Sequence, residues 1–241
     1  GTSPEIDFAL GGGAIVNLGS IVQVAGCGSG RLLAHRLENA GSIDVRGGAL
    51  NLVGGLENTG EIRGVAGSTI ALFSSSTSAP VSRSSGVIDT DGDLTLGSAR
   101  IEGSTRVGGL LTTSGESEFT ATSSFVGRAL RVGDGMTSFR AQGLELDALT
   151  IDYDGDLFVE GDVSVSGAFD WQGSLTTNGT VRASGTTTMG RGFGGLLENS
   201  GALRLVSTSI GEGSVLRNFE GAELRSDSVT RLVGGGEIEN F

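Results

Sequence analysis

Apolar and polar residues alternate along short stretches of this chain, and most stretches end at Gly, Asn, Asp or Ser. Alternation with period two is typical of a β-strand that buries one face. Tight hairpins would need frequent two-residue turns, and only Asn178-Gly179 and a few Asp-Gly pairs suit them. The pattern therefore predicts many short strands that are joined by corners rather than by hairpins. The apolar pairs that mark these strands include Ile43 and Val45, Leu50 and Leu52, Leu94 and Leu96, Val163 and Val165, and Leu203 and Leu205.

A longer motif recurs near both ends of the chain, with the order apolar, acidic, Asn, any, Gly, any, apolar. It occurs at residues 37–43, 56–62 and 197–203. Its Asn falls at positions 17, 39, 58, 199, 218 and 240, which are 22 or 19 residues apart within each end of the chain. Partial copies in the middle carry Thr90 or Tyr153 in place of the Asn. A repeat of this length is the signature of a solenoid.

The repeat predicts an all-β fold, a single right-handed parallel β-helix of roughly 12 coils with about 19–22 residues each. Equivalent corners then lie above one another, so Asn39 should stack on Asn58 and their side chains should form a hydrogen-bonded ladder. We expect Gly41 and Gly60 to supply a positive φ at these corners.

No long linker divides the sequence, which predicts one β-solenoid domain over residues 1–241. The segment at about 74–86 is rich in Ser and interrupts the repeat spacing, so we expect a loop inserted into one coil. The last residues fall inside a further copy of the motif. This predicts a segment of a longer protein, whose partners would be adjoining coils or end-to-end copies.

Composition narrows the function. The net charge is −12, all 16 basic residues are Arg and only 18% of residues are charged. An acidic chain without basic clusters argues against nucleic acid as a partner. Its longest apolar runs are too short to span a bilayer, so we expect no membrane insertion. The one cysteine, Cys27, is interpreted as a small buried hydrophobic residue, and the one histidine, His35, as an exposed polar residue before a strand.

The motif copies at 37–43, 56–62 and 197–203 resemble the Asn-x-Gly-x-Ile repeats of large bacterial surface proteins, among them autotransporter passenger domains and filamentous-haemagglutinin-like adhesins. The resemblance covers about half of the chain at the level of motifs. It implies secretion, a right-handed β-helix and an extracellular or cell-surface location. These families include adhesins, proteases and plain stalks, and the sequence contains no recognisable catalytic constellation. We therefore expect a structural or adhesive role without catalysis, with host or environmental surface glycans or proteins as further partners.

The sequence also supports alternative hypotheses for the function. Two segments, 89–93 and 152–156, have the sequence Asp-x-Asp-Gly-Asp, which is typical either of corner residues or of the start of a calcium loop. We expect no cofactor, with calcium as the alternative, and we assign no catalytic, cofactor-binding or metal residue. A polysaccharide-binding or polysaccharide-cleaving β-helix is a second candidate, with an acidic groove near Asp154, Asp170 and Trp171. The alternative interpretation, which we favour, is that Trp171 and Tyr153 are simply an exposed aromatic pair on an acidic face. A self-polymerising β-helical filament is the third.

Overall fold

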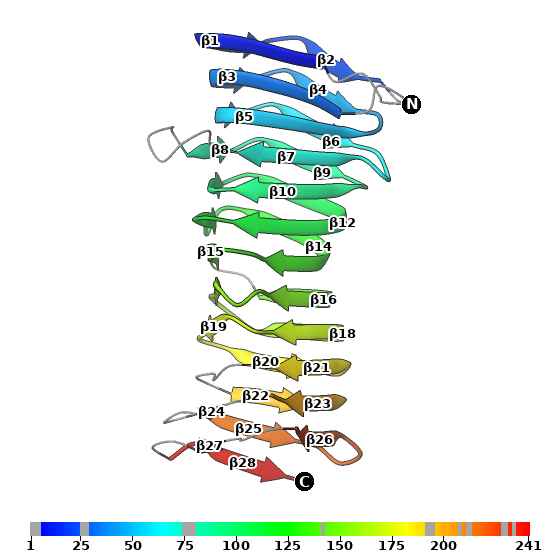
Figure 1. Ribbon diagram of the computed structural model, residues 1–241, viewed down its shortest axis with the longest axis vertical. Helices are drawn as coiled ribbons and strands as arrows, with labels where there is room; N and C mark the ends of the chain where they lie inside the picture. The colour runs from blue at the N-terminus through cyan, green and yellow to red at the C-terminus, as the bar shows by residue number, and fades with distance from the viewer. Residues whose placement is uncertain are drawn as a thin grey trace. The chain divides into compact units, whose positions relative to one another are not determined.

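The chain folds as an all-β parallel solenoid of about 10 turns, as a computed structural model shows (Figure 1). The structure describes residues 6–24, 29–73, 81–140, 143–190, 196–206, 209–210, 214–227, 231–232 and 235–241, and this part of the chain contains no helix. The predicted fold class is confirmed, with fewer coils than the dozen expected. The chain divides into two compact units, residues 1–127 and 128–241.

In the first unit each coil contributes to three lanes of parallel strands. The Asn lane contains the second halves of β1, β3 and β5, followed by β8, β11 and β13. The charge lane contains β2, β4, β6, β9 and the first half of β12. The third lane contains the first halves of β1, β3 and β5, then β7, β10 and the second half of β12. The strands are β1 (Ile6–Asn17), β2 (Ser20–Gln23), β3 (Ser29–Asn39), β4 (Ser42–Val45), β5 (Ala49–Asn58), β6 (Glu61–Gly64), β7 (Thr69–Phe73), β8 (Ser82–Ser84), β9 (Val87–Thr90), β10 (Asp93–Gly97), β11 (Ala99–Ile101), β12 (Ser104–Ser114) and β13 (Ser117–Phe119).

The core of this unit is a set of aliphatic columns. In the charge lane Ile43, Ile62 and Ile88 are in register on successive strands, and each is 0% exposed. Burying such a side chain contributes about 1.5–3 kcal/mol relative to leaving it in water. The period-two alternation in the sequence therefore marks the residues that face the core.

The predicted Asn ladder is confirmed. Asn39 is 1% exposed, its Oδ1 accepts a hydrogen bond from Asn17 Nδ2 at 2.7 Å, and its own Nδ2 donates to Asn58 Oδ1 at 2.7 Å. The next rung is Ser84, whose hydroxyl accepts from Asn58 Nδ2 at 2.9 Å. The first rung also closes its own corner, because Gly19 N donates to Asn17 Oδ1.

The reason given above for the corner glycines is wrong. Gly41 and Gly60 are not among the glycines with a positive φ. Instead, a Cβ on Gly41 would collide with the carbonyl oxygen of Gly19 in the coil before it, and a Cβ on Gly60 would collide with that of Gly41. Glycine is required at these corners because successive coils bring their backbones into direct contact.

Coil length varies more than predicted. Residues joined by hydrogen bonds between neighbouring coils are 26 apart at Asn58 and Ser84, and 16 apart at Arg182 and Glu198. Much of the expected loop at 74–86 lies outside the described residues, namely 74–80. Residues 82–84 within it form β8, which pairs with β5 and β11, so the expectation of a loop is wrong there.

The expected equivalence of Thr90 with the ladder Asn residues is also wrong. Thr90 ends β9 in the charge lane, where its register partner is Gly64 rather than Asn58. Its hydroxyl does accept a hydrogen bond from Gly92 N, as the Asn side chains do at their own corner. The motif thus describes a type of corner, and a coil has more than one corner.

The second unit is also built from lanes of parallel strands. One lane contains β15, β17 and β19. A second contains the first halves of β16 and β18, then β20, β22, β25 and β28. A third contains the second halves of β14, β16 and β18, then β21, β23 and β26, while β24 pairs with β27. The strands are β14 (Ser124–Val132), β15 (Gly135–Phe139), β16 (Leu144–Ile151), β17 (Gly155–Val159), β18 (Val163–Trp171), β19 (Ser174–Thr177), β20 (Thr180–Ala183), β21 (Thr186–Met189), β22 (Leu196–Asn199), β23 (Ala202–Leu205), β24 (Ser209–Ile210), β25 (Val215–Asn218), β26 (Glu223–Ser226), β27 (Arg231–Leu232) and β28 (Glu237–Asn240).

Buried polar and aromatic side chains also stack in this unit. Asn199 Nδ2 donates to Asn218 Oδ1 at 2.7 Å, which extends the predicted ladder principle to a second group of coils. Phe169 and Trp171 point into the core with their rings stacked, the centroids 5.6 Å apart. The core therefore accepts large aromatic side chains where the alternation places them on the inner face.

Candidate functional site

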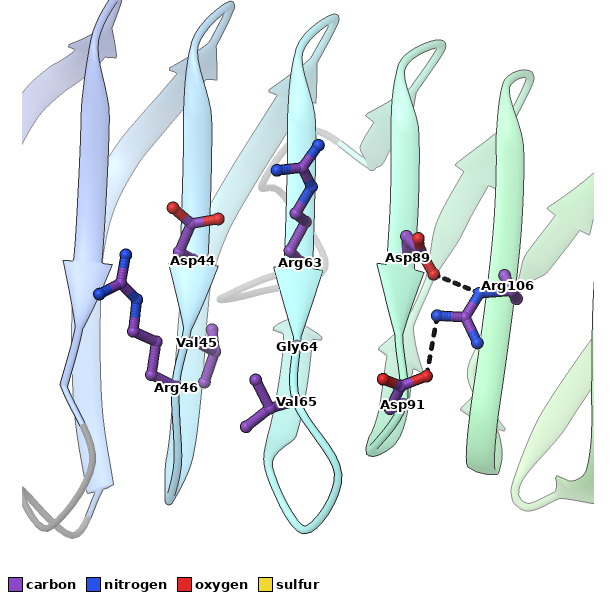
Figure 2. A pocket seen from close by; sticks show the side chains of 9 residues that line it. All are labelled: Asp44, Val45, Arg46, Arg63, Gly64, Val65, Asp89, Asp91 and Arg106. Atoms are coloured by element: carbon purple, nitrogen blue, oxygen red, sulfur yellow. Dashed lines mark ion pairs between the residues drawn. The ribbon is translucent and has the colours of Figure 1, made fainter.

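A shallow pocket of about 310 Å³ lies on the outer face of the charge lane in the first unit. Figure 2 shows its side chains on successive strands, with Asp44 on β4, Arg63 on β6, Asp89 on β9 and Arg106 on β12. The strand register places these four side chains next to one another in this order. Their charges alternate, so each coil presents a charge opposite to that of its neighbour. The pocket is lined by Asp44, Val45, Arg46, Arg63, Gly64, Val65, Asp89, Asp91 and Arg106.

Arg106 occupies one end of the pocket and is fully engaged. Its Nε lies 2.5 Å from Asp89 Oδ1 and its second guanidinium nitrogen lies 2.9 Å from Asp91 Oδ1 (Figure 2). Hydrogen bonds to Asp91 first and Asp89 second raise the pKa of Arg106 above its ordinary value. Arg106 thus holds both carboxylates against the next coil.

The other end carries charges that are less engaged. Arg63 pairs with Glu61 on its own strand at 2.5 Å, whereas Asp44 and Arg46 have no ion pair within the part of the chain that the structure describes. Charged groups of both signs can hold a small polar group by hydrogen bonds. None of the nine lining residues is a Ser, Cys, His or Lys, so the carboxylates are the only lining side chains with nucleophilic character.

The first Asp-x-Asp-Gly-Asp segment distributes its carboxylates among different tasks. Asp89 and Asp91 pair with Arg106, while Asp93 Oδ1 accepts a hydrogen bond from Leu110 N at 2.8 Å. Over the described ranges no three His, Cys, Asp or Glu side chains come together as a metal site would require. These contacts are of the kind expected for corner residues.

The second segment behaves in the same way. Asp152 pairs with Arg131 at 2.9 Å, and Gly155 N donates to the Asp152 carbonyl to close the turn. Asp154 and Asp156 are both exposed. The carboxylate of Asp152 is thus used between neighbouring coils, as those of Asp89 and Asp91 are in the first unit.

The expected exposed aromatic pair is wrong. Tyr153 is 63% exposed, but Trp171 is 1% exposed and its Nε1 donates to the Gly173 carbonyl at 3.1 Å inside the core. Asp170, on the outer face, accepts a hydrogen bond from Gln172 instead. The sequence did contain a signal for this, because Trp171 follows Phe169 with the same period of two that marks the buried aliphatic residues.

Two candidates cannot be placed. Cys27 lies outside the described residues, and the side chain of His35 does as well. Among the residues that the structure describes, no helix is long and apolar enough to cross a membrane.

Comparison with known proteins returns no match from family models, from curated proteins or from solved structures. The parallel β-solenoid fold is shown by the structure. The resemblance to bacterial surface repeats rests on the motif residues alone.

Proposed function

We propose that this chain is a structural or adhesive β-helical segment of a bacterial extracellular or cell-surface protein and that it catalyses no reaction. The observation that carries the proposal is how the surface charges are used. Many of them form ion pairs between neighbouring coils, and they add to the backbone ladders and the buried Asn stacks. This arrangement suits a body whose task is to keep its form.

The clearest example lies on the outer face of β20, β22, β25 and β28. Arg182, Glu198, Arg217 and Glu239 are in register on these strands and alternate in sign. The ion pairs along this series measure 3.2, 3.6 and 2.6 Å. Glu239 first and Glu198 second raise the pKa of Arg217 above its ordinary value. The series joins four consecutive strands.

The first unit uses the same device. Arg100 on β11 pairs with Glu118 on β13 at 2.9 Å and with Glu102 at 2.8 Å. Hydrogen bonding to Glu102 is the main reason that the pKa of Arg100 is raised. Each exposed pair is weak by itself, but networks of such pairs contribute more than isolated ones.

The proposal also explains the shallow pocket of the first unit. Its alternating charges continue the pattern of pairing between coils, and its best-formed contacts tie β9 and its corner to β12. The location is proposed from the resemblance to bacterial surface repeats.

The test is to incubate the purified chain with neutral and acidic polysaccharides and to measure reducing ends and unsaturated products. We expect no release above that of heat-inactivated protein. Turnover that depends on the folded chain would refute the absence of catalysis. Labelling of intact producing cells with an antibody to the chain tests the location, and signal only after lysis would contradict it.

A further inference from the structure

A second pocket, on the outer face of β15, β17 and β19, differs from the first in its chemistry. It has a volume of about 380 Å³, near the lower end of the range typical of small-molecule sites. Three neighbouring strands span on the order of 10 Å from the first to the third. The pocket lies entirely within the second unit, and its side chains include Met136, Ser138, Arg140, Asp156, Phe158 and Thr176.

The decisive residue is Ser138. It faces outward beside Phe158, yet it is only 6% exposed. Its hydroxyl is not among the fully enclosed side-chain atoms that lack a hydrogen-bond partner in the described part of the chain, and Ser138 lines the pocket. A hydroxyl in this position can donate a hydrogen bond to a ligand or accept one from it.

An apolar surface lies next to this hydroxyl. Phe158 is half buried, and the guanidinium carbon of Arg140 lies 5.4 Å from the centroid of its ring. Arg140 also pairs with Glu160 at 2.9 Å, which holds the guanidinium in place over the ring. Met136, 50% exposed, adds a flexible apolar side chain.

The polar groups around the Phe158 ring carry no net positive charge. The charge of Arg140 is balanced by Glu160, and Thr176 offers a hydroxyl beside Phe158 on β19. Asp156 is exposed on the same face and adds a negative charge. The pocket therefore disfavours an anionic ligand and favours a neutral one that has both an apolar face and several hydroxyl groups.

We propose that this pocket, which Phe158, Met136 and Ser138 line, binds one unit of a neutral saccharide. The sugar ring packs its C–H groups against Met136 and the part of Phe158 beside the Arg140 guanidinium, and its hydroxyls bond to Ser138, Thr176 and Asp156. This inference rests on the proposed function, of which it develops the adhesive alternative by naming the binding site and the class of ligand. It differs from the groove expected around Trp171, which is buried.

The test is affinity electrophoresis of the full chain in gels that contain dextran, galactan, xylan or mannan as neutral probes, with polygalacturonate as the acidic probe. We expect slower migration with at least one neutral probe. Phe158→Ala should weaken that interaction about tenfold, the loss that corresponds to about 1.4 kcal/mol. Ser138→Ala should weaken it about two- to tenfold, the effect of one neutral hydrogen bond.

Tyr153→Ala is the matched control, because it removes an exposed aromatic side chain that lies outside the pocket. It should leave the migration unchanged. No retardation by any neutral probe, retardation by polygalacturonate alone, or an equal effect of Tyr153→Ala and Phe158→Ala would overturn the proposal. None of these results bears on the structural role, which fails only if the chain cleaves polysaccharides.

Discussion

Removing the amide of Asn39 should cost far more stability than its size suggests, because it is the central rung of the Asn ladder. In Asn39→Ala three hydrogen bonds disappear: the two amide contacts at 2.7 Å to Asn17 and Asn58, and the bond to the Glu61 carbonyl at 3.3 Å. Each contributes about 0.5–1.5 kcal/mol net. Asn58 Oδ1 is left buried without its donor, which costs about 1–3 kcal/mol more.

Together these contributions place the expected loss in the free energy of unfolding between about 2.5 and 7.5 kcal/mol. The loss is smaller than it would otherwise be, because Asn17 Nδ2 keeps its hydrogen bond to the Ser42 carbonyl at 2.9 Å. The assay is urea denaturation of the whole chain followed by circular dichroism, with comparison of midpoints at an unchanged slope.

Asn51→Ala supplies the matched control. Asn51 lies on the outer side of β5, is half buried and has no hydrogen bond from its side chain within the described residues. A loss of less than about 0.5 kcal/mol is expected there, as for most surface substitutions. If the two variants lose the same amount, the ladder does not hold the coils together and the reasoning is wrong.

Four further outcomes are expected. Gly60→Ala should lower the melting temperature markedly, since its Cβ would meet the Gly41 backbone, and an unchanged melting curve would contradict the close approach. Thr187→Val should raise the free energy of unfolding by about 1 kcal/mol, because Thr187 is 0% exposed, pairs in register with Phe169 and has a hydroxyl without a partner in the described chain; a loss would show that the hydroxyl is satisfied. Arg182 first and the Thr180 amide second hold the pKa of Asp162 below its ordinary value of 3.8. The ionised Asp162 carboxylate therefore stabilises the fold above its unfolded pKa, and this stabilisation is lost as the pH falls through its folded pKa. Asp162→Asn should for this reason flatten the decline of the melting temperature below about pH 4. Millimolar calcium should leave the melting temperature of the chain unchanged, and a rise would restore the Asp-x-Asp-Gly-Asp segments as calcium loops.

The fold class could be predicted because the alternation and the motif spacing both depend on the backbone. Period two identifies the inner face of each strand, and the Asn residues at 39 and 58 stack as their spacing indicates. The position of Thr90 could not be predicted. Its local pattern is that of an Asn corner, but only the lane in which β9 pairs decides which corner it occupies.

The candidate sites were less predictable, because an outward position is assigned by register between coils rather than by neighbours in the sequence. Phe158 and Ser138 are 20 residues apart in the chain and adjacent in space only through the pairing of β15 with β17. For Trp171 the sequence did contain the answer. A functional role was considered because it is the one Trp of the chain, but its spacing of two from Phe169 already indicated that it faces the core.

The tolerance of coil length has a consequence for protein engineering. The hydrogen bond from Asn58 to Ser84 spans 26 residues, yet it continues the same ladder as the bond from Asn39 to Asn58, which spans 19. A coil can therefore be longer by several residues while the same side chains still meet in the core. A foreign peptide spliced between two strands should likewise leave the rungs on either side with their partners, which would make the chain a carrier for epitope display.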